Sequence, residues 1–185
     1  CEFVSLRAEA EMFEGLPLIT LQGSPLYGWN LVIKRVLDVV GASAALVVFS
    51  PVLCAIAALV KLTSPGPVFF RQLRMGLDGQ AFEMLKFRSM KLDAESETGP
   101  VWTQPNDDRR TPIGAFLRRT SLDELPQFWN VLRGEMSIVG PRPERPEFIA
   151  RFRETLPQYM LRHKMKAGIT GWAQINGWRG NTSLE

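Results

Sequence analysis

One uncharged apolar run constrains this chain more than any other feature. The run extends from Val39 to Val60, in a chain that is otherwise rich in Arg, Lys, Asp and Glu. At about 1.5 Å per residue, a continuous helix of this length reaches about 33 Å, enough to cross a hydrocarbon core of about 30 Å. The run therefore predicts a membrane helix.

A proline near the middle of the run predicts that this helix bends. Pro51 has no N–H and its ring collides with the carbonyl four residues earlier, so a kink or break is expected there. The hydroxyl of Ser50 can satisfy part of the backbone that the proline frees. At the start of the run, Asp38 is expected to pair with Lys34 or Arg35, which lie one turn before it.

Basic residues flank the run on both sides, with Lys34 and Arg35 before it and Lys61, Arg71 and Arg74 after it. Lys and Arg near a membrane segment mark the cytoplasmic side. Similar flanks therefore favour a re-entrant helix-break-helix whose two ends lie on one face of the bilayer. The alternative is a spanning helix with a tolerated kink, with the following domain outside the cytoplasm.

The charge and composition of the chain indicate which classes of binding partner it suits. The net charge is +3, and the excess of Lys and Arg lies after the apolar run, where it suits lipid head groups or phosphorylated substrates. Nucleic acid is disfavoured, because the basic residues are interleaved with Asp, Glu and Pro and no zinc-ligand spacing occurs. Cys1 and Cys54 form no disulfide framework, which is consistent with a reducing compartment. The start at Cys1, with no signal-peptide pattern, indicates a fragment.

The pattern along the chain predicts a mostly helical α+β protein: a re-entrant membrane helix, then a compact cytoplasmic catalytic domain with a small β-hairpin. The expected divisions are the tail of a missing N-terminal domain at 1–33, the re-entrant helix at 34–63 and a C-terminally truncated catalytic domain at 64–185. The expected elements are a short polar helix at 1–15, hairpin strands at 68–72 and 82–88, and helices at 110–119, 124–132 and 143–162, the last interrupted at Pro157; 168–180 is expected to be loop or strand.

Two adjacent carboxylates, Asp123 and Glu124, are the candidate catalytic pair. A structural alternative is a capping box, in which Ser121 begins a helix and Glu124 stands three residues later. Pro126 argues against it, because proline belongs in the first turn of a helix. The helix is then expected to start later, which leaves both carboxylates in the preceding turn, where they can face a ligand.

Cations surround this pair in the sequence and predict a phosphate site. Arginine forks pair with phosphate oxygens, and magnesium is commonly held by one or two carboxylates together with substrate phosphates. A carboxylate can also attack phosphorus to give an aspartyl-phosphate type intermediate. The candidate phosphate contacts are Lys86, Arg88, Arg118, Arg142 and Arg145. The candidate Mg²⁺ ligands are Asp123 and Glu124.

Taken together, these motifs make the chain resemble a family over roughly residues 34–185. The motifs are KRVLD at 34–38, SPGPVFFRQ at 64–72, KFRSM at 86–90, RRTSLDELPQFWNVLRGEMSIVGPRPE at 118–144 and GITGWAQINGW at 168–178. They are similar to those of the bacterial monotopic phosphoglycosyltransferases, the polyprenyl-phosphate sugar-1-phosphate transferases that start exopolysaccharide and O-antigen synthesis. The leader before residue 36 resembles the join to the extra N-terminal domain of the undecaprenyl-phosphate glucose phosphotransferase-like members.

The resemblance implies a two-step reaction at the cytoplasmic face of the bacterial inner membrane. Asp123 would attack the sugar-linked phosphorus of a UDP-sugar, with UDP-glucose as the first expectation, and undecaprenyl phosphate would then displace the phosphosugar. Glu124 would assist magnesium binding or the second attack. The five cations named above are carried over as phosphate or nucleotide contacts, and the family's Ser-Pro break in the re-entrant helix falls on Ser50 and Pro51.

The chain departs from the family pattern in a few places. The usual Asn-Asp-Pro-Arg before the carboxylate pair appears as Asn106-Asp107-Asp108-Arg109, and the following Thr-Arg appears as Thr111-Pro112. These changes affect local loop shape and remove one candidate cation. A homodimer contact from the missing N-terminal domain stays open. The rival function is a non-catalytic, membrane-anchored module that recruits polysaccharide-assembly partners through its basic surface.

Overall fold

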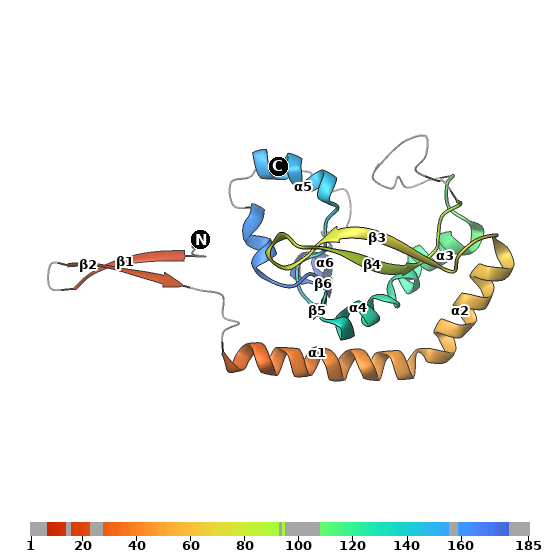
Figure 1. Cartoon of the computed structure of the whole chain (residues 1–185), viewed down its shortest axis with the longest axis horizontal. Coiled ribbons are helices and arrows are strands. Elements are labelled where there is room, and N and C mark those ends of the chain that lie inside the picture. Colours follow the sequence, from red (N-terminus) through yellow and green to blue (C-terminus); the bar gives the residue numbers. More distant parts are fainter. Residues whose placement is uncertain are drawn as a thin grey trace.

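Two consecutive helices, α1 (Trp29–Val48) and α2 (Ser50–Thr63), form the apolar run in the computed structural model of the chain. The structure describes residues 7–13, 16–22, 28–92, 94, 108–155 and 159–177. Among these residues, no single helix has both the length and the apolar composition to cross a membrane. The α1 and α2 pair meets that test only jointly, and it is bent by 61° (Figure 1). The predicted bent helix is confirmed, although α1 begins before residue 34.

The break between the two helices is local. The amide of Phe49 donates to the Ala45 carbonyl and the amide of Leu53 donates to the Phe49 carbonyl, each at 2.8 Å. Between them, the carbonyl of Val47 would bond the amide that Pro51 lacks. The Ser50 hydroxyl donates to that carbonyl instead, at 2.8 Å. This confirms the prediction for Ser50: at the bend, the Val47 carbonyl accepts from this hydroxyl and from a backbone N–H at the end of α1.

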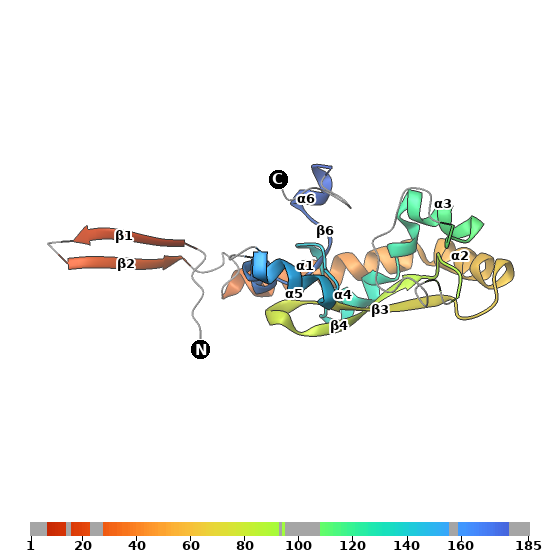
Figure 2. The same ribbon diagram turned by 90° about the horizontal axis from the view of Figure 1, so that it is seen from above.

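The two limbs of the bend pack on different neighbours. α1 buries Asp38 and Ala42 against α4 (Gln127–Arg133) and β5 (Ser137–Val139). Apolar side chains elsewhere on α1 are exposed, including Val40 and Val47. α2 buries Ile56 and Val60, and α3 (Pro112–Thr120) lies beside it in both views (Figures 1 and 2).

After α2 the chain forms the predicted hairpin. Strand β3 (Phe69–Met75) pairs antiparallel with β4 (Ala81–Phe87), with Phe69 opposite Phe87 and Met75 opposite Ala81. The connection is a short 3₁₀ turn, η1 (Leu77–Gly79), in which Asp78 and Gly79 both have positive φ, at 52° and 74°. Asp and Gly are among the residues that tolerate this backbone region, which explains the sharp reversal there.

The described residues after the hairpin are mostly helical, which confirms the predicted fold class. The 3₁₀ turn η2 (Leu122–Glu124) joins α3 to α4, and α5 (Pro146–Thr155), η3 (Tyr159–Lys164) and α6 (Trp172–Ile175) follow β5. Strand β5 pairs in parallel with β6 (Gly168–Thr170), a contact that was not predicted. The interruption predicted at Pro157 lies outside the described residues.

The prediction of a short polar helix at 1–15 is wrong. Strand β1 (Arg7–Phe13) pairs antiparallel with β2 (Leu16–Gln22), and Phe13 stands opposite Leu16 (Figure 1). The physical reason is visible in the sequence. From Arg7 to Met12, charged and apolar residues alternate with a period of two, which favours a strand over a helix.

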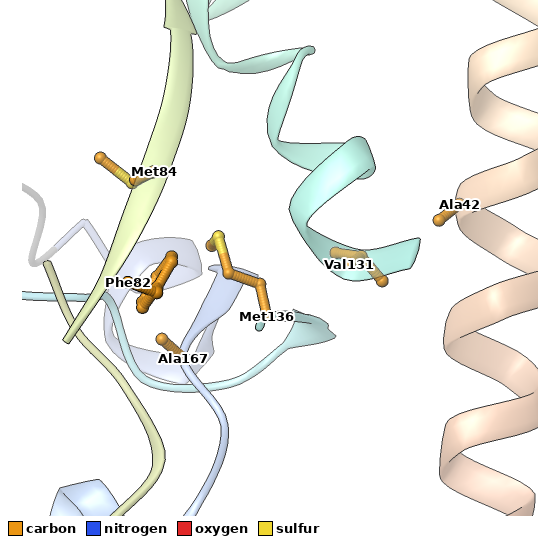
Figure 3. Close-up of a cluster of buried hydrophobic side chains, with 6 residues drawn as sticks. All are labelled: Ala42, Phe82, Met84, Val131, Met136 and Ala167. Carbon is orange, nitrogen blue, oxygen red and sulfur yellow. The ribbon is translucent and has the colours of Figure 1, made fainter. Parts of the chain in front are cut away.

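Two apolar clusters support this arrangement. In the first, Ala42 of α1 faces Val131 of α4, and Phe82, Met84, Met136 and Ala167 complete the group (Figure 3). In the second, Ile56 and Val60 of α2 pack with Phe87 and Leu117. The buried amide of Asn130 lies close to the first cluster: it accepts from the Leu85 amide and donates to the Glu83 carbonyl, which fixes α4 on β4.

Candidate active site

The turn η2 carries both candidate catalytic carboxylates. Ser121 enters it in the left-handed region, at φ 59°, and its side chain makes no cap hydrogen bond, so the capping-box alternative is wrong. Helix α4 begins at Gln127, directly after Pro126. The carboxylates of Asp123 and Glu124 therefore lie in the turn before the helix, as predicted, and both residues are buried, at 5% and 8% exposure.

Glu124 is fixed by two cations from distant parts of the chain. Its Oε1 atom accepts hydrogen bonds from Lys86 Nζ of β4 and from Arg142 Nη2, each at 2.9 Å. Burial alone would raise the pKa of Glu124, but the charges and hydrogen bonds of Lys86 and Arg142 outweigh it and lower the pKa to about 2. Glu124 is thus an ionised, immobilised carboxylate at neutral pH.

Asp123 has different surroundings, although it is the adjacent residue. Burial raises the pKa of Asp123 and the charge of Glu124 adds to this, while Lys86 and Arg118 oppose it. Within the part of the chain that the structure describes, no cation forms an ion pair with the Asp123 carboxylate. A desolvated carboxylate without a bonded counter-ion is more nucleophilic than a paired one, so this arrangement suits covalent chemistry at Asp123.

Both carboxylates line one open cavity of about 1970 Å³. Cations from three separate segments are among the residues that line the same cavity: Lys86 of β4, Arg118 of α3, and Arg142 and Arg145 after β5. This volume exceeds the roughly 300–1,000 Å³ of common small-ligand pockets. The cavity is large enough for a bulky anionic ligand, and its charge favours phosphate groups.

The arginines among the predicted phosphate contacts differ in the groups that their guanidinium nitrogens contact. Arg118 Nε donates to the Ser89 hydroxyl at 2.9 Å, and Arg145 Nε lies 3.6 Å from a Glu147 carboxylate oxygen. Arg88 also borders the cavity, but its guanidinium is turned to the end of α2. There it donates to the Pro65 carbonyl at 2.7 Å and to the Ser64 carbonyl at 2.9 Å. Its role as a phosphate contact stays a prediction.

Arg74 lines the candidate site, although the sequence indicated it only as a basic residue that follows the apolar run. Its side chain lines the cavity and donates to the Pro143 carbonyl at 3.1 Å and to the Gln72 amide oxygen at 2.7 Å. Burial lowers the pKa of Arg74 to about 10. The signal that could have found it is the period-two spacing of Gln72 and Arg74, which places both on one face of β3.

The Mg²⁺ prediction concerns the same pair of carboxylates. Among the described residues, no group of three His, Cys, Asp or Glu side chains gathers as a candidate metal site. Two adjacent carboxylates in a cavity lined by cations fit the mode in which Mg²⁺ is shared between protein carboxylates and substrate phosphates. Ser50 and Pro51 are not among the residues that line the cavity, because they form the bend between α1 and α2.

The fold and the site together define a class of protein. An apolar, bent helix pair is packed on an α+β domain that holds a buried Asp-Glu pair in a cation-lined cavity. Residues 29–185 match the family described as bacterial sugar transferase, and the chain belongs to this family.

Two of the relatives below are named as undecaprenyl-phosphate sugar transferases with different sugars, and the third is named for exopolysaccharide production. The chain is 54% identical, over 97% of its length, to the UDP-glucose:undecaprenyl-phosphate glucose-1-phosphate transferase of Escherichia coli (strain K12), of which it covers 39%. It is 46% identical, over 84% of its length, to the UDP-N-acetylgalactosamine-undecaprenyl-phosphate N-acetylgalactosaminephosphotransferase of Aeromonas hydrophila, of which it covers 36%. It also covers 78% of the exopolysaccharide production protein PSS of Rhizobium leguminosarum bv. phaseoli, at 47% identity over 83% of this chain.

Proposed function

We propose that this chain is the catalytic part of a phosphoglycosyltransferase that moves a sugar-1-phosphate from a UDP-sugar to undecaprenyl phosphate. This transfer is the first membrane step of exopolysaccharide or O-antigen synthesis. The observation that carries the proposal is the contrast between two adjacent carboxylates. Glu124 is held by Lys86 and Arg142, whereas Asp123 lines the same cavity and bonds no cation among the described residues.

The reaction has two displacements at one phosphorus atom. A carboxylate oxygen of Asp123 attacks the phosphorus that bears the sugar, the bond from that phosphorus to the bridging oxygen breaks, and UMP leaves. The product is an acyl phosphate in which the phosphosugar is bound to Asp123. An oxygen of undecaprenyl phosphate then attacks the same phosphorus and releases the Asp123 carboxylate, which gives undecaprenyl diphosphate-sugar.

The cations have two tasks in this scheme. Lys86 and Arg142 hold Glu124 ionised beside the nucleophile, and their charge also stabilises phosphate oxygens during the displacement. Arg118 and Arg145 line the same cavity and bind the phosphates of the donor. When Mg²⁺ is bound, Asp123 and Glu124 would hold it together with donor phosphates, where it neutralises phosphate charge.

UDP-glucose is the donor that we propose. Two relatives that match over nearly the whole chain, from Escherichia coli and Klebsiella pneumoniae, are named as UDP-glucose transferases. The Aeromonas relative specifies an N-acetylated sugar, so the donor is tested directly. UMP release is measured with a panel of UDP-sugars and a short polyprenyl phosphate. UDP-glucose is expected to be fastest, and faster release from UDP-N-acetylgalactosamine would contradict this choice.

We also propose that α1 and α2 enter the inner membrane from its cytoplasmic face and return to it. The 61° bend and the exposed apolar side chains of both limbs support a re-entrant pair. Single cysteines placed at Trp29 and Asp78 report the topology by labelling from outside intact cells. Both are expected to be protected. Labelling of only one of the two would contradict the re-entrant arrangement and favour a spanning helix.

The covalent step is tested by Asp123→Asn. Loss of the nucleophile is expected to lower transfer by at least about 1000-fold and to abolish the adduct formed with phosphorus-labelled donor. Asp78→Asn is the matched control, because Asp78 is exposed in the hairpin turn and pairs with Lys164 at 3.1 Å, outside the residues that line the cavity. An active Asp123→Asn variant would exclude this carboxylate as the nucleophile. No UMP release from any donor would support the non-catalytic alternative.

A further inference from the structure

Lys86 and Arg142, which bond Glu124, come from two segments of the chain, and each segment is attached to a different limb of the bent helix pair. Lys86 lies on β4, and Arg142 follows β5. Within the described residues, neither side chain hydrogen-bonds to α1 or α2, and both donate to Glu124 Oε1. The attachment of each strand to a limb is made by another residue.

The first attachment is Asp38 of α1, which is 4% exposed. One of its carboxylate oxygens accepts from the Ile138 amide at 3.0 Å, from the Ser137 hydroxyl at 3.1 Å and from Lys34 Nζ at 2.7 Å. A buried carboxylate is costly unless it is bonded, and these contacts satisfy it. They also fix the start of β5 on the face of α1.

The backbone between β5 and Arg142 is held in place by hydrogen bonds to the segment around β6. The Gly140 amide donates to the Thr170 carbonyl at 2.9 Å, and the Gly168 amide donates to the Pro141 carbonyl at 2.9 Å. A Cβ atom at Gly140 would lie 2.2 Å from the Lys166 carbonyl oxygen, so the two segments pack backbone against backbone. The strand that Asp38 holds therefore sets the position of the Arg142 backbone.

The second attachment is Arg88, which is 5% exposed and follows β4. Its guanidinium donates to the carbonyls of Ser64 and Pro65 and to the Ser64 hydroxyl, at 2.7 to 2.9 Å, directly after α2 ends. A Cβ atom at Gly66 would lie 2.2 Å from Arg88 Nη1, so the turn closes tightly over the guanidinium. Arg88 therefore ties the end of α2 to the strand that carries Lys86.

We propose that Asp38 and Arg88 are positioning residues: Asp38 of α1 places Arg142 on Glu124, and Arg88 at the end of α2 places Lys86 on Glu124. The position of each limb is thereby linked to one of the cations, Arg142 or Lys86, that bond Glu124. The kinetic consequence rests on the proposed function, because it concerns the rate at which Asp123 forms the phosphosugar adduct.

The first experiment measures adduct formation in a single turnover, with the full chain in lipid nanodiscs, labelled UDP-glucose and no acceptor. The amplitude gives the fraction of active sites, and the rate constant per active site is insensitive to simple loss of folded protein. Asp38→Ala and Arg88→Met are each expected to lower this rate constant about tenfold, since small displacements of catalytic groups are costly. Asp78→Asn and Arg71→Met are the matched controls on exposed ion pairs.

Double-mutant cycles test whether each residue acts through its assigned cation. Asp38→Ala is expected to change the rate constant less than about twofold when Arg142 is already Gln, and Arg88→Met likewise when Lys86 is already Gln. If the fold-changes of the two single variants multiply in the double variant, the two residues act independently. That result would overturn the proposal for that limb. Arg88→Lys separates positioning from phosphate binding: a lower rate constant at unchanged donor KM supports positioning, whereas a higher donor KM at an unchanged rate constant overturns it.

Hydrogen exchange tests the same link without any reaction. Asp38→Ala is expected to speed exchange in peptides that cover 137–142, and Arg88→Met in peptides that cover 84–88, while Arg71→Met changes neither. Unchanged protection in both variants would overturn the proposal. If the unmodified chain formed no adduct, the proposed function would fail, and hydrogen exchange would still decide whether Asp38 and Arg88 position their strands.

Discussion

The two limbs of the bent helix pair come from one apolar run, yet they attach to the rest of the chain by different forces. α1 is held near its middle by polar contacts, where Asp38 accepts from the Ile138 amide of β5 and Arg35 donates to the Val131 and Leu132 carbonyls at 2.6 and 2.8 Å, and the small Ala42 is its one member of an apolar cluster among the buried described residues. α2 is held along its length by the apolar cluster around Ile56 and Val60. Hydrogen bonds fix direction and register, whereas apolar burial supplies free energy without direction.

This difference teaches what each limb contributes. The polar attachment of α1 fixes where the domain sits along the helix. The apolar attachment of α2 is expected to carry more of the stability, and Arg88 fixes its register by holding the turn after Thr63. The comparison predicts that truncating an apolar partner of α2 costs more free energy of unfolding than removing a polar partner of α1.

Leu117→Ala is the largest expected effect. Leu117 is 1% exposed and packs in the cluster under α2, so its truncation is expected to lower the free energy of unfolding by about 3 kcal/mol. Denaturant titration in detergent micelles measures this. Phe116→Ala is the control on the same helix, since Phe116 is 45% exposed, and it is expected to cost less than about 1 kcal/mol. Equal losses of unfolding free energy in the two variants would contradict the conclusion that the apolar cluster holds α2.

Alanine substitutions at two glycines test the comparison of the two limbs with a smaller expected change in the free energy of unfolding. A Cβ atom at Gly114 of α3 would lie 1.9 Å from the Ser89 carbonyl oxygen, which is backbone, so Gly114→Ala is expected to cost about 2 kcal/mol. At Gly41 of α1 the obstacle is the flexible end of Ile138, at 2.7 Å. Gly41→Ala is therefore expected to cost less than about 1 kcal/mol, since alanine also favours the helix. Thermal unfolding of both variants checks the order, and a reversed order would contradict it.

Local features of the fold were predictable from the sequence, because their signals lie within a few residues. Pro51 marks the bend, Asp78 and Gly79 mark the hairpin turn, and Pro126 marks the late start of α4. Each signal acts through backbone restrictions of the residue itself. The alternation from Arg7 to Met12 was equally local, and the error there came from the wrong period.

Contacts between distant segments were not predictable in the same way. Asp38 was expected to pair with Lys34 or Arg35, and it does pair with Lys34, but nothing nearby in the sequence indicates its bonds to Ser137 and Ile138. The parallel pairing of β5 with β6 likewise joins two very short strands without a periodic pattern. For the candidate site, residue types and the family resemblance assembled the carboxylates and cations. Their difference required the fold: Glu124 is held by Lys86 and Arg142, and Asp123 forms no ion pair within the described part of the chain.

Arg35→Met tests the polar limb directly. Loss of its two hydrogen bonds to the carbonyls at the end of α4 is expected to lower the free energy of unfolding by about 1–2 kcal/mol, because bonds from a charged donor are worth more than neutral ones. Lys61→Met on α2 is the control. Lys61 makes an exposed bond of 3.4 Å to Gly66, and its loss is expected to cost less than about 0.5 kcal/mol. A loss for Arg35→Met larger than that for Leu117→Ala would invert the comparison.

The smallest expected effect lies at the junction of the limbs. Ser50→Ala is expected to cost no more than about 1 kcal/mol, because the Val47 carbonyl loses its bond of 2.8 Å from the hydroxyl but keeps a bond from a backbone N–H. In a Pro51→Ala background the new amide at position 51 can bond that carbonyl, so the same substitution should cost almost nothing. Spin labels at the exposed positions Trp29 and Leu62, in a background without Cys1 and Cys54, report the bend. Their separation is expected to increase in Pro51→Ala, and an unchanged separation would mean that packing against the domain, rather than the proline, holds the two limbs at their angle.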